Sequence, residues 1–136
     1  MGEPFRHRMR VRYHECDPQG VVFNANYLAY CDICLTELWR ESVEGYAGMA
    51  AKGIDVVVAE ARIRFLAPLR FDEEFEVQLG IRQLGRTSME LELKFERDGE
   101  PIAETEMAQV FIELEHGEKI PIPDEIRRGL EPYVIG

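Results

Sequence analysis

The sequence predicts an α+β protein in which one antiparallel sheet wraps around a single long central helix. Apolar residues recur at helical spacing over residues 26–43 only, whereas the flanking segments alternate apolar and polar residues as strands do. The expected order is one strand, the long helix and then four strands, with hairpin connections that make the sheet mostly antiparallel. A sheet with one apolar face has to cover that face, and this helix is the long one available.

The first strand is expected over residues 5–13 and ends at the turn Asp17–Gly20. Its packed face alternates with arginines, and the packed residues are Phe5, His7, Met9, Val11 and Tyr13. The arginines are interpreted as a solvated, ion-paired sheet face rather than a ligand site; they are Arg6, Arg8, Arg10 and Arg12.

The long helix is expected from Asn26 to Val43, with Asn26 or Asn24 as its N-cap. It is apolar around much of its circumference, which is typical of a helix enclosed by other elements. The apolar positions are Tyr27, Leu28, Tyr30, Cys31, Cys34, Leu35, Leu38 and Trp39.

Period-two alternation resumes after Gly53 and predicts four further strands. Asp98-Gly99 is a strong two-residue hairpin signal between the last two, of which the second runs over residues 102–115. A short helix follows at Asp124–Leu130. The inward-facing residues of the first three of these strands are Val57, Ala59, Ala61, Ile63 and Phe65; Phe75, Val77, Leu79 and Ile81; and Met89, Leu91, Leu93 and Phe95.

Length and charge narrow the classes of function. A chain of 136 residues is expected to form one domain, residues 1–136, and its net charge of −10 argues against nucleic-acid binding. Its longest apolar stretch is too short to span a bilayer, and no secretory signal is visible, so we expect a cytoplasmic protein that does not associate with a membrane.

Cys31 and Cys34 form a CxxC spacing in a chain of three cysteines. A redox pair would lie at the start of a helix after a strand, whereas this pair lies inside the predicted helix. No second pair of ligands completes a zinc site. Buried, reduced thiols are therefore expected, and neither a metal nor a cofactor is predicted.

The segment from Cys16 to Tyr27 combines a candidate nucleophile with a candidate oxyanion site. Asp17 lies in a Pro/Gly turn that leads directly into the apolar helix, and a carboxylate is ionised at neutral pH. The first turn of a helix has unpaired N–H groups that stabilise negative charge. An Asp-Pro turn also forms for conformational reasons alone, so the residues leave both readings open.

The turn Asp17-Pro18-Gln19-Gly20, the Val-Val-Phe that follows it and the Asn-Tyr helix start together resemble the hotdog-fold acyl-CoA thioesterases, typified by 4-hydroxybenzoyl-CoA thioesterase. The resemblance implies that Asp17 acts as nucleophile or general base, and that the backbone N–H near Asn24 polarises the thioester carbonyl. It implies that Gly20 lets the chain approach the substrate closely. It further implies that Arg86, Thr87 and Ser88 contact the nucleotide end of coenzyme A.

The acyl group is expected to lie against Phe23, Tyr27, Asp32 and Ile54. Where relatives often have Tyr or His, this chain has Asn24, so a backbone role is the one that survives. Ile54 replaces a polar residue that helps to bind the ring in the hydroxybenzoyl enzyme, and that substrate is therefore not supported. Asp32 keeps a helix carboxylate that relatives share, and whether it lines the pocket is left open.

Other charged residues are expected to be structural. His14 and Glu15 are interpreted as surface residues at the strand end, His7 as a packed residue and His116 as a turn residue. Arg86 is the first choice for coenzyme A, while the remaining arginines are expected to pair with glutamates across strands; they are Arg62, Arg64 and Arg82.

Three functions are compatible with these residues. The first is an acyl-CoA thioesterase that hydrolyses its substrate to free acid and CoA and assembles edge to edge as a homodimer or homotetramer. The second is an acyl-thioester hydratase or dehydratase, which normally needs a His a few residues from the Asp, and none occurs between Asp17 and His116. The third is a module that binds acyl thioesters without turnover.

Overall fold

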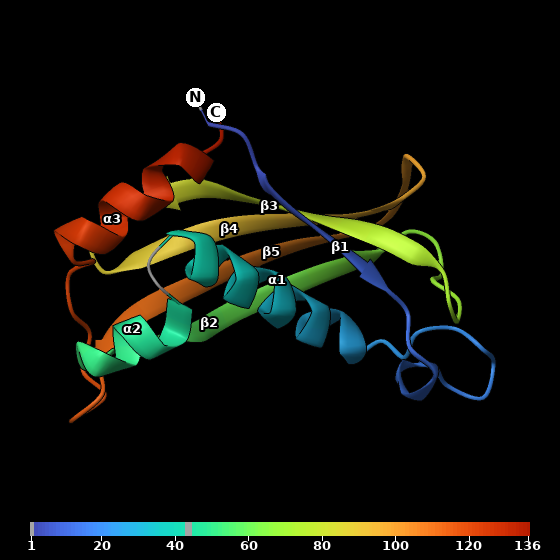
Figure 1. Ribbon diagram of the computed structural model, residues 1–136, viewed down its shortest axis with the longest axis horizontal. Helices are drawn as coiled ribbons and strands as arrows, with labels where there is room; N and C mark the ends of the chain where they lie inside the picture. Colours follow the sequence, from blue (N-terminus) through green and yellow to red (C-terminus); the bar gives the residue numbers. More distant parts are fainter. Residues whose placement is uncertain (1, 43–44) are drawn as a thin grey trace.

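One long helix lies across a curved five-stranded antiparallel sheet, as predicted (Figure 1). The computed structural model describes residues 2–42 and 45–136. The strands pair in the order β1-β3-β4-β5-β2, with bounds β1 Phe5–Arg10, β2 Ile54–Phe65, β3 Glu74–Leu84, β4 Ser88–Arg97 and β5 Glu100–Glu113. The helices are α1 Asn26–Ser42, α2 Gly45–Ala51 and α3 Asp124–Leu130, with short 3-10 turns at Tyr13–Glu15 and Glu131–Tyr133. None of the helices described is long and apolar enough to cross a membrane.

The core lies between α1 and the middle of the sheet. Every predicted inward residue of β3 and β4 is buried, and so is the face of α1 that carries Leu38 and Trp39. Aromatic rings fill the end of the core nearest the start of α1, where Tyr27 and Tyr30 both pack on Phe95 at centroid distances of 5.5 and 6.4 Å. These contacts fix the start of α1 against the sheet.

The first strand is shorter than predicted. It ends at Arg10, and Val11 stays buried while Tyr13 is 82% exposed in the 3-10 turn. The backbone N–H of Val11 still donates to the Glu73 carbonyl at 2.9 Å, but the chain then turns away from the sheet. Placing Tyr13 on the packed face was therefore wrong.

A bulge in β2 changes which of its residues face the helix. Pairing with β5 shifts between Val58 and Glu60, so Val56 rather than Val57 shares the inward face with its partner Phe111. Beyond the bulge Ile63 packs on the core as predicted, whereas Ala59, Ala61 and Phe65, which were also predicted to be packed, are exposed. A period-two pattern carries no sign of an inserted residue, which is why the sequence placed Val57 inward.

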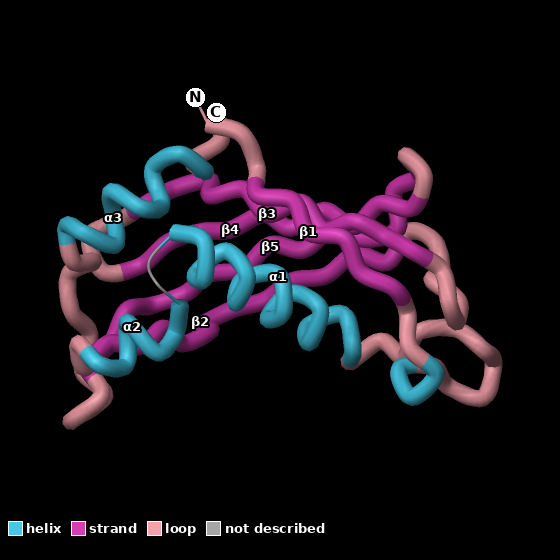
Figure 2. The backbone as a smooth tube through the Cα atoms, viewed as in Figure 1, coloured by secondary structure: helices cyan, strands magenta, loops and turns pink. Residues whose placement is uncertain are grey.

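Helix α1 is less enclosed than its composition predicts. Leu28 and Ile33 are 41% and 42% exposed on the side of the helix away from the core. The helix ends at Ser42, and Val43, its predicted last residue, lies outside the described residues. Helix α2 follows and was not predicted, because its small residues show no apolar periodicity. Figure 2 shows α1, α2 and α3 on the same side of the sheet.

Ion pairs cover the outer face of the sheet. Arg6 pairs with Glu76 at 3.0 Å, Arg8 with Glu74 at 2.9 Å, and Arg10 with both Glu74 and Asp72. On the other strands the pairs are Arg62 with Glu106, Arg64 with Glu104 and Arg82 with Glu92. The interpretation of these six arginines as a paired, solvated face is confirmed, whereas Arg12, which was predicted to share the face, lies beyond the end of β1 and forms no ion pair among the described residues.

The Asp98-Gly99 hairpin is also confirmed, with φ angles of 50° and 81° at its two turn residues. Such left-handed angles are those of a type I′ turn, which suits the twist of the strands on either side. The turn joins β4 to β5 at the same end of the sheet as the loop between β1 and α1 (Figure 1).

The three cysteines are free thiols, and Cys31 and Cys34 are buried as predicted. Burial raises the pKa of each of these two thiols to about 12. At pH 8 both therefore stay protonated and unreactive.

We expect Ellman's reagent to modify at most the half-buried Cys16 in the folded protein and all three cysteines in guanidinium. Rapid reaction of two or more thiols in the folded state would contradict this packing.

Candidate active site

The candidate site is a closed loop between the end of β1 and the start of α1. Cys16 and Val22 form an antiparallel bridge, and the N–H of Asp17 donates to the Val21 carbonyl at 2.9 Å. The loop is joined to the β2–β3 connection as well, because the N–H of Val22 donates to the Leu69 carbonyl at 2.8 Å. Gly20 has a φ of 79°, an angle that other residues rarely adopt, and this glycine allows the turn to close.

Asp17 is half-buried and has one carboxylate oxygen engaged. Its Oδ1 accepts the N–H of Gln19 at 2.8 Å, while its carbonyl accepts the N–H of Gly20 at 2.9 Å. This is an Asx turn, so the conformational role of Asp17 is real. Its second carboxylate oxygen, Oδ2, accepts no hydrogen bond from the residues that the structure describes, and it is left for a ligand or water.

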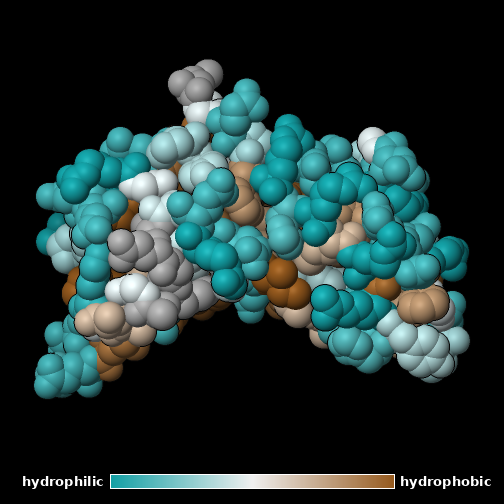
Figure 3. Space-filling model, in the orientation of Figure 1, coloured by the Kyte–Doolittle hydropathy of each residue, from teal (hydrophilic) through white to brown (hydrophobic). Residues whose placement is uncertain are grey.

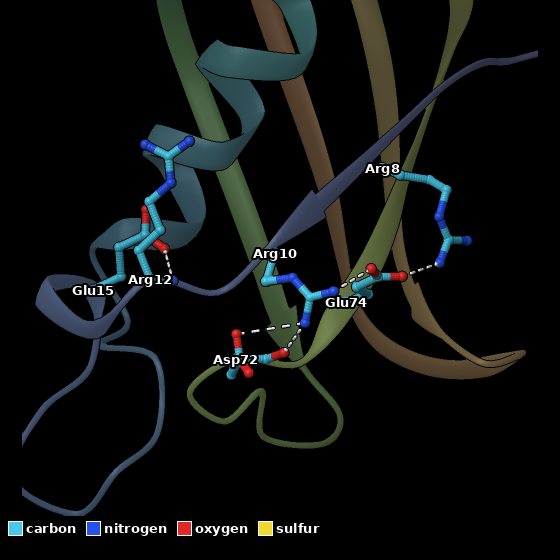
Figure 4. Close-up of polar contacts among 6 residues, drawn as sticks. All are labelled: Arg8, Arg10, Arg12, Glu15, Asp72 and Glu74. Carbon is cyan, nitrogen blue, oxygen red and sulfur yellow. Dashed lines mark hydrogen bonds and ion pairs between the residues drawn. The ribbon is translucent and has the colours of Figure 1, made fainter.

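Glu15 ties the loop to helix α1. Its carboxylate oxygen Oε1 accepts the N–H of Arg12 at 2.7 Å and the hydroxyl of Tyr30 at 2.8 Å, and Figure 4 shows the first of these bonds. Its carbonyl accepts the N–H of Phe23 at 3.0 Å and the side-chain amide of Asn26 at 2.8 Å. Burial, together with the bond to Glu15, raises the pKa of the Tyr30 hydroxyl, which stays protonated and donates.

Glu15 is thus a half-buried structural residue, and reading it as a surface residue of the strand end was wrong. The sequence contains one signal for this role, an acid three residues after Arg12 in a position to accept a backbone N–H. His14 next to it is exposed, as predicted.

The backbone N–H of Asn24 is free at the entry to α1. The N–H of the adjacent Ala25 likewise finds no acceptor in the described chain, whereas the donors before and after this pair are occupied: Phe23 bonds to the Glu15 carbonyl, Asn26 to the Phe23 carbonyl and Tyr27 to the Asn24 carbonyl. Within residues 2–42 and 45–136 no acceptor pairs with the N–H of Asn24, and the residue is exposed. Among the described residues, the side-chain oxygen of Asn26 accepts no N–H of the helix; its side-chain amide instead donates to the Glu15 carbonyl.

The predicted acyl-contacting residues differ in their surroundings. Phe23 is 54% exposed beside Asn24, whereas Tyr27 is buried and packs edge-on against Phe65 with ring centroids 5.1 Å apart. Burial raises the pKa of the Tyr27 hydroxyl. Asp32 lies on the exposed side of α1, and partial desolvation raises the pKa of its carboxyl.

The remaining predicted site residues lie at the opposite end of the sheet. Phe95, which packs on Tyr27, comes seven positions after Ser88 in β4, a separation of about 23 Å along the strand. Arg86 and Thr87 precede Ser88, and Ile54 begins β2 at this same end, where Figure 1 shows α2 and α3. One protomer therefore does not bring Asp17 and the Arg86-Thr87-Ser88 turn together.

The three histidines lie apart from Asp17 or face solvent. His7 is half-buried in β1 opposite Val77, and His116 is exposed in the turn after β5, where its N–H donates to the Glu113 carboxylate. Glu113, Glu115 and His116 come close to one another there, but Glu113 already accepts backbone N–H groups of the turn. This arrangement is that of a structural turn.

Comparison with known proteins identifies the family of this chain. The profile of the thioesterase-like superfamily matches residues 11–130. The chain belongs to this superfamily. A putative esterase of Aquifex aeolicus is 28% identical over 128 residues, covering 94% of this chain and 98% of that protein. A 1,4-dihydroxy-2-naphthoyl-CoA hydrolase of Thermosynechococcus vestitus is 28% identical over 131 residues, covering 94% and 90%.

Solved structures agree with the fold. A gentisyl-coenzyme A thioesterase matches with a TM-score of 0.83 and 27% identity, over 93% of this chain and 98% of that one. A hypothetical protein from Aquifex aeolicus matches with a TM-score of 0.89 and 28% identity, over 93% and 99%. The prediction of a hotdog-fold thioesterase is confirmed.

Gly20 provides a test of the loop that has a matched control. An added Cβ meets nothing within 4 Å at Gly20 or at Gly99, and the two have φ angles of 79° and 81°. Gly20→Ala and Gly99→Ala should therefore each lower the free energy of unfolding by about 1–2 kcal/mol, measured in urea. Only Gly20→Ala displaces Asp17, and it should lower kcat on the order of tenfold to a hundredfold. Equal kcat values for the two variants would contradict a catalytic role for this turn.

Proposed function

We propose that this protein hydrolyses acyl-CoA thioesters to the free acid and CoA, with Asp17 as nucleophile or general base and the backbone N–H of Asn24 as oxyanion donor. The observation that carries the proposal is a free helix-entry N–H in the same closed loop as a carboxylate with one unbonded oxygen. Superfamily membership and relatives named as CoA thioester hydrolases support the same reaction.

Both roles of Asp17 use the same two groups. As a nucleophile, its carboxylate attacks the thioester carbonyl carbon, CoA leaves as thiolate, and water then cleaves the resulting anhydride. As a base, it removes a proton from the water that attacks the carbonyl. In each case negative charge develops on the carbonyl oxygen, and a positioned N–H donor of this kind contributes about 100- to 1000-fold to the rate. A thiolate leaves without help, so no further acid is needed.

Replacing Asp17 by Asn tests the assignment. The amide keeps an oxygen that accepts the Gln19 N–H, so the loop should stay folded while the nucleophile or base is lost. We expect a fall in kcat of at least about 100-fold in release of CoA thiol from short, long and aromatic acyl-CoAs, with an unchanged melting temperature. Full activity in Asp17→Asn would show that another group performs the reaction.

The same assay separates the alternatives. Ligand-induced thermal stabilisation of the unsubstituted protein without turnover of any acyl-CoA would favour a binding module. Water addition to an enoyl-CoA, followed by ultraviolet absorbance, would favour a hydratase.

We further propose that the complete site forms between two protomers paired along β2. Strand β2 is an edge strand, and it exposes Val57, Val58 and Phe65 by 41–49%. Helix α1 exposes Leu28 and Ile33 on the same side of the sheet, and Figure 3 shows hydrophobic surface at the middle of this face. Exposed apolar edge strands are typically covered by another strand. A two-fold axis makes the two β2 strands antiparallel, so the Ile54 end of one strand meets the Phe65 end of the other.

This pairing accounts for the separation of the predicted residues. The end of the sheet that carries Ile54, Arg86, Thr87 and Ser88 in one protomer is placed next to the Asp17 loop of the second. The CoA nucleotide would then lie on one protomer while the thioester reaches the other. At that point this acidic protein presents Arg86, an arginine that no carboxylate of the described residues neutralises. Across the described residues, the side chain of Arg86 forms no ion pair.

Mixing two variants tests the shared site. Asp17→Asn and Arg86→Glu should each be poorly active at low substrate concentration, and both should be dimers by light scattering. Unfolding and refolding them together should restore about a quarter of the unsubstituted activity, because half of the randomly formed dimers carry one intact site of two. Activity equal to the mean of the separate variants would place the whole site within one protomer.

A further inference from the structure

The turn between β3 and β4 is held in place by an arginine that the sequence did not single out. Arg127 lies on α3, and its guanidinium donates from Nη2 to the Gly85 carbonyl at 2.5 Å and from Nη1 to the Leu84 carbonyl at 3.5 Å. It is half-buried, and no carboxylate among the described residues pairs with it. The partners of this guanidinium are backbone carbonyls and not a carboxylate, so Arg127 fixes the conformation of the backbone in the turn.

Every carbonyl of this turn is bonded within the protein. Besides the two held by Arg127, the Arg86 carbonyl accepts the N–H of Ile122 at 2.8 Å and the Thr87 carbonyl accepts the N–H of Phe111 at 2.9 Å. The Ser88 carbonyl accepts the N–H of Gly85 at 2.8 Å. Five successive carbonyls, from Leu84 to Ser88, are thus directed away from solvent.

The groups that remain at the turn are donors. The backbone N–H groups of Arg86 and Thr87 donate no hydrogen bond within the part of the chain that the structure describes. The Arg86 guanidinium and the hydroxyls of Thr87 and Ser88 accompany them. Outward-facing carbonyl oxygens would repel a phosphate, whereas successive N–H groups beside a guanidinium attract one.

Helix α3 is anchored so that Arg127 meets the turn. Ile126 and Leu130 are buried at 2% and 0% exposure and fix the orientation of the helix on the core. Glu125 pairs with Lys52 at 2.8 Å, which joins the start of the helix to the chain after α2. Arg128, the next residue, is exposed instead.

We propose that Arg127 is a positioning residue for coenzyme A: it turns the carbonyls of Leu84 and Gly85 inward and so leaves the Arg86-Thr87-Ser88 turn with donors alone facing the phosphates. This inference rests on the proposed thioesterase function. Arg127 binds the backbone of the turn and not the ligand. The planar guanidinium fork of Arg allows this one side chain to reach two carbonyls.

Two substrates that share an acyl group test the proposal. An acyl-CoA carries the nucleotide, and the matching acyl-N-acetylcysteamine thioester lacks it. In Arg127→Ala the KM for acyl-CoA should rise about tenfold, the effect expected on losing a charged hydrogen bond. Both kinetic constants for the short thioester should stay within twofold of those of the unsubstituted protein, which also shows that the variant is folded.

Two further variants sharpen the test. Arg127→Lys keeps the charge but loses the fork, and it should raise the KM for acyl-CoA nearly as much as Arg127→Ala; full rescue by Lys would overturn positioning in favour of simple attraction of the phosphates. Arg128→Ala, the neighbouring exposed arginine, should leave the KM unchanged. If Arg127→Ala does not fold, the comparison of Arg127→Lys with Arg128→Ala decides.

The outcomes keep the two proposals apart. Failure of the unsubstituted protein to hydrolyse either thioester would contradict the proposed function. Normal hydrolysis of both thioesters by Arg127→Ala, or an equal loss on both, would contradict the role of Arg127 alone.

Discussion

Four hydrogen bonds converge on Glu15, and the candidate active site depends on them. Two reach its carboxylate, from Arg12 and Tyr30, and two reach its carbonyl, from Phe23 and Asn26. Hydrogen bonds to a charged group are worth about 1.5–3 kcal/mol each, enough to order a short loop against its conformational entropy. They engage the Phe23 N–H and the Asn26 side-chain amide and leave the N–H groups of Asn24 and Ala25 between them unpaired, as an oxyanion site requires.

Most arginines of this acidic chain are neutralised where they lie. The outer face of the sheet pairs its arginines with glutamates across strands, and such exposed pairs contribute little stability individually. Their effect is to remove positive charge from most of the surface. Arg86 has no carboxylate partner among the described residues, and the neighbouring Arg127 donates its hydrogen bonds to backbone carbonyls. The end of the sheet that these two share is therefore suited to bind a polyanion.

Much of the fold was predictable because its patterns are regular. Helix α1, the inward faces of β3 and β4 and the Asp98-Gly99 turn follow directly from spacing and turn chemistry. The bulge at Val58 and the early end of β1 were not predictable, since each depends on contacts with strands distant in sequence. The exposed sides of Leu28 and Val57 were missed for a related reason, because alternation identifies apolar residues without saying what covers them.

The candidate site, like the fold, has parts that the sequence predicted and parts that it did not. The Asp17 turn was found because Pro, Gly and an acid occur together before a helix. Glu15 and Arg127 were missed because their partners are mostly backbone carbonyls and N–H groups, which sequence patterns do not report. Only the strand register shows that Arg86 and Ile54 lie far from Asp17. This separation is the reason for proposing that a second protomer completes the site.

A crystal structure with a non-hydrolysable acyl-CoA analogue, in which a methylene group replaces the thioester sulfur, tests the central claim most directly. The account predicts that the ketone oxygen accepts the backbone N–H of Asn24 at about 2.7–3.1 Å, with the Asp17 carboxylate facing the carbonyl carbon. It also predicts that the phosphates lie on the Arg86-Thr87-Ser88 turn of the second protomer. A ketone bound away from Asn24, with its oxygen held by other donors, would contradict it.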